Sequence, residues 1–223
     1  MKKSILNLSS LTHKYVIALA GMFLMLFLIF HLMTNLLMLL GDGGEAFDEA
    51  VAFLAGNPMI KVMEYVLFAG FIIHILFGVI IWFRNQRARP VGYHAGLKSE
   101  TSLFSKFMFH TGVIIFIFLV IHLANFFFIK LGLVPVPDHA RDAHDFYAMA
   151  VVLFKDPWYS GIYLVSFVFL GFHLKHAFQS AFQSLGLNHN KYTPAIKVIG
   201  TIYAIAISVG FATIPVYFLF IHS

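Results

Sequence analysis

The chain has 223 residues, of which 60% are hydrophobic and only 11% are charged, with a net charge of +5. An ordinary soluble domain is about half apolar and about a quarter charged, so this composition indicates a membrane protein. The sequence contains no cysteine, which excludes disulfides, cysteine-ligated iron–sulfur clusters and covalently attached c-type haem. Any redox centre therefore needs other ligands.

Five stretches are apolar enough and long enough to cross a bilayer, whose core requires roughly 20 residues of helix. They cover residues 15–40, 60–83, 107–131, 160–185 and 195–221. We therefore predict an all-α, polytopic membrane protein in which residues 1–223 form a single transmembrane domain. The first stretch is too long for a cleaved signal peptide and has no small-residue cleavage site, so we expect it to remain in the chain.

The connecting segments predict the orientation of the chain. One set of connections carries most of the basic residues, namely Lys2, Lys3, Lys14, Arg84, Arg87, Arg89, Lys98, Lys106, Lys191 and Lys197. The other set carries most of the acids, namely Asp42, Glu45, Asp48, Glu49, Asp138, Asp142, Asp145 and Asp156. Because positive loops face the cytoplasm, we predict a cytoplasmic N-terminus and an external C-terminus.

Two shorter segments in the external connections are amphipathic. They are AFDEAVAFLAGNP, which ends at Pro58, and DAHDFYAMAVVLFKDP, which ends at Pro157. Each predicts a short amphipathic helix at the outer surface, and Pro58 is expected to begin the second span. On the cytoplasmic side, the polar loop from Val91 to Ser105 is a candidate for contact with a partner.

Histidines lie deep within four of the five apolar stretches, and an internal repeat relates one histidine from each. Gly21 stands ten residues before His31, and Gly112 stands ten residues before His122, each histidine being followed by leucine. In the same way, the two prolines that end the amphipathic segments each stand 16 residues before a histidine, His74 and His173. The repeat predicts that spans one and two match spans three and four about a pseudo-twofold axis along the membrane normal.

The depth of each histidine predicts how the four are paired. His31 and His122 lie about 25 Å from the inner ends of their helices, whereas His74 and His173 lie nearer the inner side, at 1.5 Å of rise per residue. Under the pseudo-twofold axis, His31 faces His122 and His74 faces His173. Neutral imidazole is a good iron ligand and is costly when left alone in hydrocarbon, so we predict two stacked bis-histidine haems.

Small and basic residues near these histidines are further candidates for the cofactor sites. A missing or short side chain gives a macrocycle room beside a helix, and a basic group can pair with haem propionates. The candidates are Gly21, Gly112, Gly78, Ala177, Arg84 and Lys175. The other readings are that the histidines are structural or line a pore, and that the glycines serve helix packing. Seven further histidines fall near interfaces or in loops, where we expect solvent: His13, His94, His110, His139, His144, His189 and His222.

These residues resemble the single-chain, five-helix, di-haem cytochrome b anchor of succinate dehydrogenases and fumarate reductases. The resemblance spans nearly the whole chain and rests on an ordered set: Ser9, Ser10 and Lys14; Gly21, His31 and Asn35; His74 with Ala88, Arg89, Pro90 and Tyr93; Thr111 and Gly112; His122 and Leu123; Phe172, His173 and Leu174. It implies that the four axial ligands of two haem b groups are His31, His74, His122 and His173, with His176 a neighbour.

The resemblance also implies the partners and the reaction. A flavoprotein subunit would interconvert succinate and fumarate, and an iron–sulfur subunit would carry electrons to the inner haem. The outer haem would exchange them with a membrane quinone, expected to be menaquinone, in a prokaryotic cytoplasmic membrane. This chain would be the anchor and relay of a respiratory complex II, without a catalytic residue for succinate and without a nucleic-acid partner. Some relatives carry a glutamate two residues before the fourth ligand, where this chain has Gly171, and that difference favours succinate oxidation.

The quinone site has two candidate clusters, Glu64 with Tyr65 and Asn35 in the outer half, or His13 with Lys14 and Ser10 near the inner surface. For Glu64, an interfacial carboxylate near Lys61 is the simpler reading. Two alternative functions remain open: a di-haem quinone-reactive subunit of another respiratory dehydrogenase, and a haem-free proton or metal transporter. A cytochrome b with two ligands on each of two helices is disfavoured, since four helices supply one histidine each.

Overall fold

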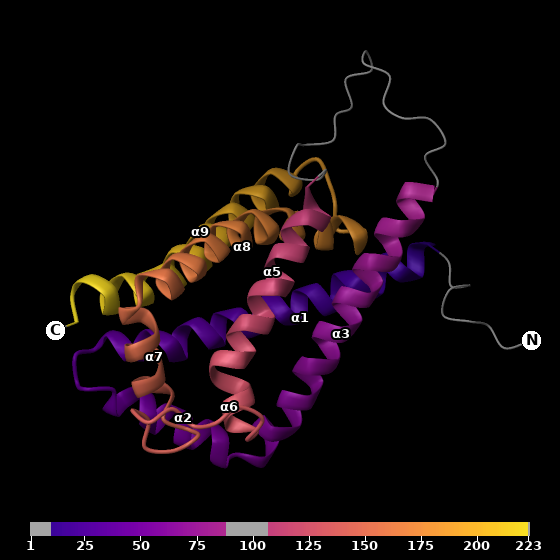
Figure 1. The fold of residues 1–223 in the computed structure, drawn as a ribbon. Coiled ribbons are helices and arrows are strands. Elements are labelled where there is room, and N and C mark those ends of the chain that lie inside the picture. Colours follow the sequence, from indigo (N-terminus) through magenta and orange to yellow (C-terminus); the bar gives the residue numbers. More distant parts are fainter. Residues whose placement is uncertain (1–9, 88–106, 223) are drawn as a thin grey trace, which may run out of the picture.

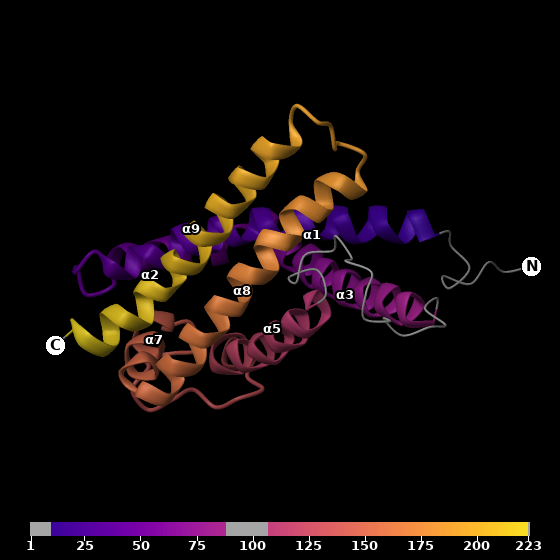
Figure 2. The same cartoon turned by 90° about the horizontal axis from the view of Figure 1, so that it is seen from above.

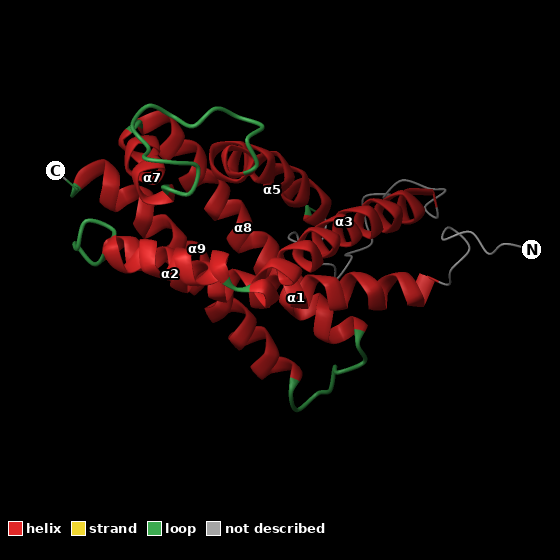
Figure 3. Cartoon of the chain, turned by 90° about the horizontal axis from the view of Figure 1, so that it is seen from below, coloured by secondary structure: helices red, strands yellow, loops and turns green. Residues whose placement is uncertain are grey.

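The computed structural model describes residues 10–87 and 107–222, and within these ranges the chain is helical without any strand (Figure 3). The long helices are α1 (Ser10–Leu36), α3 (Pro58–Arg87), α5 (Met108–His122), α8 (Pro157–Ser184) and α9 (Thr193–Phe220). A 3₁₀ turn, η2 (Leu37–Leu39), extends α1, while η3 (Leu123–Phe127) and α6 (Phe128–Lys130) extend α5. Five of the resulting helices are long and apolar enough to cross a membrane, as the composition predicts.

Local sequence signals explain where α3 and α8 begin. Each starts with a proline, which lacks the N–H that a first helical turn leaves unpaired. The residue before each proline caps the helix: Asn57 Oδ1 accepts from the Met59 N–H at 2.9 Å, and Asp156 Oδ1 accepts from the Trp158 N–H at 2.7 Å. The expected start of the second span at Pro58 is confirmed, whereas the predicted start of the fourth span, at residue 160, is three residues too late.

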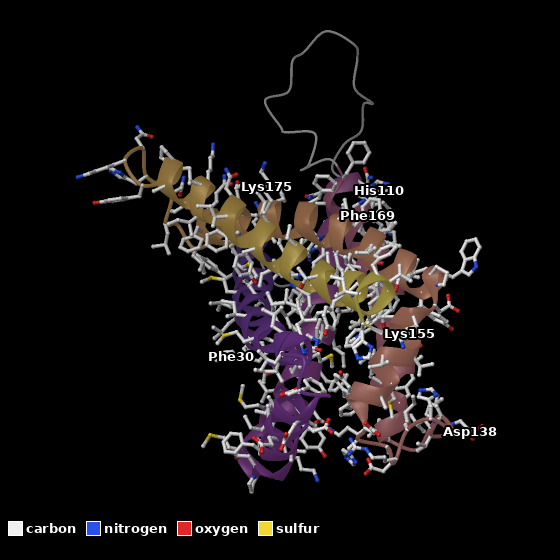
Figure 4. The ribbon with its side chains drawn as sticks, turned by 90° about the vertical axis from the view of Figure 1, so that its left-hand side faces the viewer. Phe30, His110, Asp138, Lys155, Phe169 and Lys175 are labelled. Carbon is white, nitrogen blue, oxygen red and sulfur yellow. The ribbon has the colours of Figure 1, made fainter. Side chains whose placement is uncertain are left out.

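The helix α1 lies at the centre of the bundle. It packs along α3 on one side and against α8 and α9 on the other, while α5 packs against α8 (Figures 1 and 2). The most extensive packing joins α8 to α9, and the core between these helices includes Tyr163, Phe167, Phe211 and Ile214. Much of the remaining apolar surface is exposed, as Phe30 illustrates on the outside of α1 (Figure 4), which suits contact with lipid.

Two short helices, α2 (Glu45–Gly56) and α7 (Phe146–Lys155), lie together at the end of the bundle where α9 finishes (Figure 1). They correspond to the two predicted amphipathic segments. Arg141 joins them, because its guanidinium binds Asp48 of α2 at 2.5 Å and Asp145, the N-cap of α7, at 2.7 Å. The α2–α7 cluster therefore links the first half of the chain to the second outside the spans.

The continuation of α5 departs from regular α geometry directly after His122. Residues Leu123–Phe127 form a π-helix, in which each turn holds an extra residue. Such segments are rare and are frequent at functional sites. No sequence signal predicted it.

Several predicted features lie outside the described residues. They are the Val91–Ser105 loop and the residues Lys2, Lys3, Ser9, Ala88, Arg89, Pro90, Tyr93, His94, Lys98 and Lys106.

Candidate functional site

The four deep histidines form two close pairs, each made by helices from different halves of the chain. The ring centroids of His31 in α1 and His122 in α5 are 5.8 Å apart, with the ring planes at 76°. Those of His74 in α3 and His173 in α8 are 6.3 Å apart, with the planes at 70°. We call these the first and second ring pairs.

The helices that carry each ring pair are not close packing neighbours. The main packing partners of α1 are α3, α8 and α9, whereas α5 packs against α8 and contacts α3 only slightly. The imidazoles therefore reach toward each other between helices whose backbones stay apart. Helices α3 and α5 are also the least buried spans. Only 6% of the residues in the most apolar stretch of each are buried, against 28% in α1 and 33% in α9.

Aromatic rings surround the first ring pair. Phe27 stacks on His31 at a centroid distance of 5.1 Å, and Phe118 stacks on His122 at 5.9 Å. Three more rings lie within 5.4 to 6.2 Å of one of these histidines: Phe126, Tyr163 and Phe211. The phenolic oxygen of the buried Tyr163 accepts a hydrogen bond from Asn125 in the π-helix, at 3.1 Å. This pair therefore lies in an apolar, low-dielectric setting.

One histidine of each ring pair has a polar side chain beside its Nδ1. Thr111 Oγ1 lies 3.2 Å from Nδ1 of His173. Asn35 Nδ2 lies 3.3 Å from Nδ1 of His31 and donates to the backbone carbonyl of the same residue at 2.7 Å. The spacing of the sequence predicts neither bond, although Thr111 precedes the repeat glycine directly.

The other histidine of each pair is less well satisfied. Nδ1 of His74 and Nδ1 of His122 are buried and make no hydrogen bond of normal length within the described chain. The His74 ring lies beside the backbone of Ile17. Because unsatisfied polar atoms are costly in an apolar interior, both ring pairs have unused capacity for hydrogen bonding or metal binding.

The repeat glycines contact the histidines of the second ring pair. A Cβ atom at Gly21 would lie 3.3 Å from Cε1 of His74, and one at Gly112 would lie 3.5 Å from Cε1 of His173. The space at each glycine thus admits an imidazole from the neighbouring helix. Gly78 has different surroundings, since a Cβ atom there would lie 3.6 Å from Cδ1 of Ile17. This glycine therefore serves the packing of α3 against α1.

No protein-family model, curated protein or solved structure matches this chain.

The basic candidates occupy different surroundings. Arg84 Nη1 lies 3.2 Å from Nδ1 of His13, whose ring is fully buried and packs against Phe77 at 5.2 Å. The expectation that His13 is solvated is therefore wrong, because the first turn of α1 lies against the end of α3. Lys175 is exposed on the outside of α8, toward the same end of the bundle as the exposed His110 (Figure 4).

The outer quinone candidates do not share one surrounding. Glu64 forms an ion pair with Lys130 of α6 at 2.6 Å, so its charged partner comes from another span and is not the neighbouring Lys61. Tyr65 is 70% exposed, and Asn35 bonds within α1. Of the inner candidates, His13 is buried beside Arg84, whereas Lys14 is exposed.

Gly171 marks a close approach of α8 and α9. A Cβ at this position would lie 2.9 Å from Ser208 Oγ, so a larger side chain would have to displace Ser208. A carboxylate at position 171 would therefore require the Ser208 hydroxyl to move aside. Five residues further along α8, His176 is partly buried.

Proposed function

We propose that this chain is the membrane-anchor cytochrome b subunit of a succinate:quinone oxidoreductase, holding two b-type haems between His31 and His122 and between His74 and His173. Its function is to relay electrons between an iron–sulfur subunit and a membrane quinone, which we take to be menaquinone. The single observation that carries the proposal is the separation of the rings in the two pairs.

The two separations fit one metal between each pair of imidazoles. A metal–imidazole nitrogen distance of about 2.0–2.1 Å, with the nitrogen roughly 1.1 Å from the ring centroid, separates two coaxial rings by about 6.3 Å. The observed values are 5.8 and 6.3 Å. Direct contact between two unligated rings would need no such agreement in both pairs.

The donor set favours a cofactor over a metal bound by protein alone. Within the described ranges, no three His, Asp or Glu side chains gather as a metal cluster. The two imidazoles of each ring pair would hold the iron of a porphyrin, and the porphyrin would supply its other nitrogen ligands. A bound b-type haem supplies reversible one-electron chemistry.

The positions along the helices favour two stacked sites. His31 and His122 each lie eight residues before the ends of their spans, Leu39 and Lys130, or about 12 Å along a helix. His74 and His173 each lie 16 residues after the first proline of their helices, or about 24 Å. Both repeat glycines contact the histidine of the following span in their own half. A pseudo-twofold relation between the halves accounts for all three matches.

The chain's own residues would hold and shield these sites. The rings of Phe27, Phe118 and Phe211 keep water from the first ring pair, while Gly21 and Gly112 let the second ring pair approach the neighbouring helices. The assignment to succinate oxidation and to flavoprotein and iron–sulfur partners rests on the ordered sequence resemblance. The basic inner loops suit docking of the iron–sulfur subunit.

The test is the reduced-minus-oxidised optical spectrum of the purified full chain, with haem quantified per polypeptide. We expect two b-type haems. His31→Ala or His122→Ala should remove one haem, and His74→Ala or His173→Ala should remove the other. His176→Ala is the matched control, since it lies on α8 three residues after a ligand and should keep both haems.

The succinate assignment needs its own measurement. The tagged chain, isolated from its native membrane, should copurify with a flavoprotein and an iron–sulfur protein, and succinate should reduce its haems. If the haems are reduced only by an electron donor other than succinate, the chain is a subunit of a different respiratory dehydrogenase. A colourless, folded preparation would refute the haem proposal and favour a proton or metal transporter.

A further inference from the structure

Thr111 is a buried polar residue in the apolar part of α5, 8% exposed, directly before Gly112. Its hydroxyl makes two contacts. Oγ1 donates to the backbone carbonyl of Met108 at 2.9 Å, and the same oxygen lies 3.2 Å from Nδ1 of His173 on α8. The residue thus connects the α5 backbone to one ring of the second ring pair.

The proton count fixes the direction of the second bond. A hydroxyl has one proton and two lone pairs. Because that proton is given to Met108, the oxygen can only accept from His173, so Nδ1 of His173 carries the proton. In a neutral imidazole this leaves the lone pair on Nε2, the nitrogen that is then able to bind a metal.

We propose that Thr111 is a positioning residue that sets the tautomer and orientation of His173 for metal binding through Nε2. This inference rests on the proposed function, because it assigns a role toward the haem at the second ring pair. The hydroxyl acts through the imidazole and does not contact the cofactor itself.

Asn35 shows that the first ring pair is arranged differently. Its amide nitrogen donates to the His31 carbonyl and lies 3.3 Å from Nδ1 of the same ring. An amide nitrogen has no lone pair to accept with, so Asn35 cannot accept a proton from Nδ1 of His31 as Thr111 does from His173. The role of Thr111 is therefore specific to the second ring pair.

The experiment compares three variants of the full-length chain purified with its haems. Thr111→Val keeps the side-chain shape and removes the acceptor, whereas Thr111→Ser keeps the hydroxyl. Thr213→Val is the matched control, because Thr213 is exposed on α9 and its hydroxyl likewise donates three residues back, to Gly210 at 2.6 Å. Each variant is examined by haem retention, redox titration and electron paramagnetic resonance.

We expect Thr111→Val to weaken haem retention at one site by about 10- to 100-fold, the usual effect of losing an outer-shell partner, and to change its midpoint potential. The affected haem should be the one that His74→Ala removes. Thr111→Ser and Thr213→Val should resemble the unsubstituted chain. Retention of the haem between His31 and His122 shows that the Val variant is folded.

Three results would overturn the inference. If Thr111→Val leaves both haems unchanged, or alters both equally, Thr111 does not position His173, although the proposed function stands. If Thr111→Ser is as impaired as Thr111→Val, packing of the threonine methyl explains the effect instead. If the unsubstituted chain binds no haem, the proposed function and this inference both fail.

Discussion

Asp145 offers the most quantitative test of the fold, because it holds the α2–α7 cluster together outside the spans. Its side chain is 3% exposed and accepts from Arg141 Nε at 2.7 Å, from Arg141 Nη2 at 3.0 Å and from two backbone N–H groups. We compare Asp145→Asn, which removes the charge, with Asp145→Ala, which also removes the N-cap of α7.

The hydrogen bonds from Arg141 lower the pKa of the Asp145 carboxyl from 3.8 to about 2. One pKa unit corresponds to about 1.36 kcal/mol, so this difference amounts to about 2.5 kcal/mol of stability. Since Arg141 is 71% exposed, we expect screening by water to reduce it to about 1–2 kcal/mol. A lowered carboxyl pKa stabilises the fold above pH 4, and this stabilisation is lost as the pH falls from about 4 to about 2.

Hydrogen exchange of the α7 segment and thermal unfolding followed by tryptophan fluorescence, both in detergent, measure the effect. Tryptophan fluorescence is suitable because Trp158 lies just beyond α7. Unfolding assays that use a thiol-reactive dye are not suitable, because the chain has no cysteine. At pH 7 we expect Asp145→Asn to lower the free energy of unfolding by about 1–2 kcal/mol. Asp145→Ala should lower it by about 1 kcal/mol more, because it also removes the N-cap. Asp138→Asn, in the exposed loop before Arg141, is the control (Figure 4). If Asp145→Asn matches the unsubstituted chain at pH 7 and in its acid midpoint, the reasoning is wrong.

Three further predictions concern the spans. Gly21→Ala should shift the His74 ring by a few tenths of an ångström and alter the spectrum of the haem proposed there, whereas Gly112→Ala meets an ordinary contact and should not; equal spectra would contradict the geometry. Glu64→Gln or Lys130→Gln should each cost about 1 kcal/mol in thermal unfolding, because the pair is only half-buried, and exchanging the two residues should restore part of it. His13→Ala should cost about 2–4 kcal/mol by emptying a fully buried ring position, which unfolding in mixed detergents would measure.

The apolar spans and the two short helices α2 and α7 could be predicted because their signals are local. Hydropathy locates a helix that must satisfy its backbone within itself, and the prolines at 58 and 157 mark the starts of α3 and α8. The four histidines that the repeat selects are those that the structure brings into two close pairs. Two histidines that lie the same number of residues from equivalent glycines or prolines reach the same depth in the bundle. Equal spacing in the sequence can therefore indicate which histidines are paired.

Contacts that depend on how helices lean together were not predictable. His13 looks interfacial because it stands near the chain start, yet the end of α3 covers it. Glu64 has a lysine three residues away in sequence, but its partner Lys130 comes from α6. Neither the hydroxyl of Thr111 beside His173 nor the π-helix after His122 has a signature, since both arise from packing between spans.

The division of each ring pair between the two halves of the chain has a consequence for biogenesis. A membrane chain is inserted from its N-terminus as it is synthesised, so α1 and α3 enter the bilayer while α5 and α8 are still being made. During that interval His31 and His74 face lipid or each other's helix without the rings that later oppose them. Neither pair can close before its second-half helix arrives. Any group held between the rings is therefore acquired late, after at least α5 has been released into the membrane.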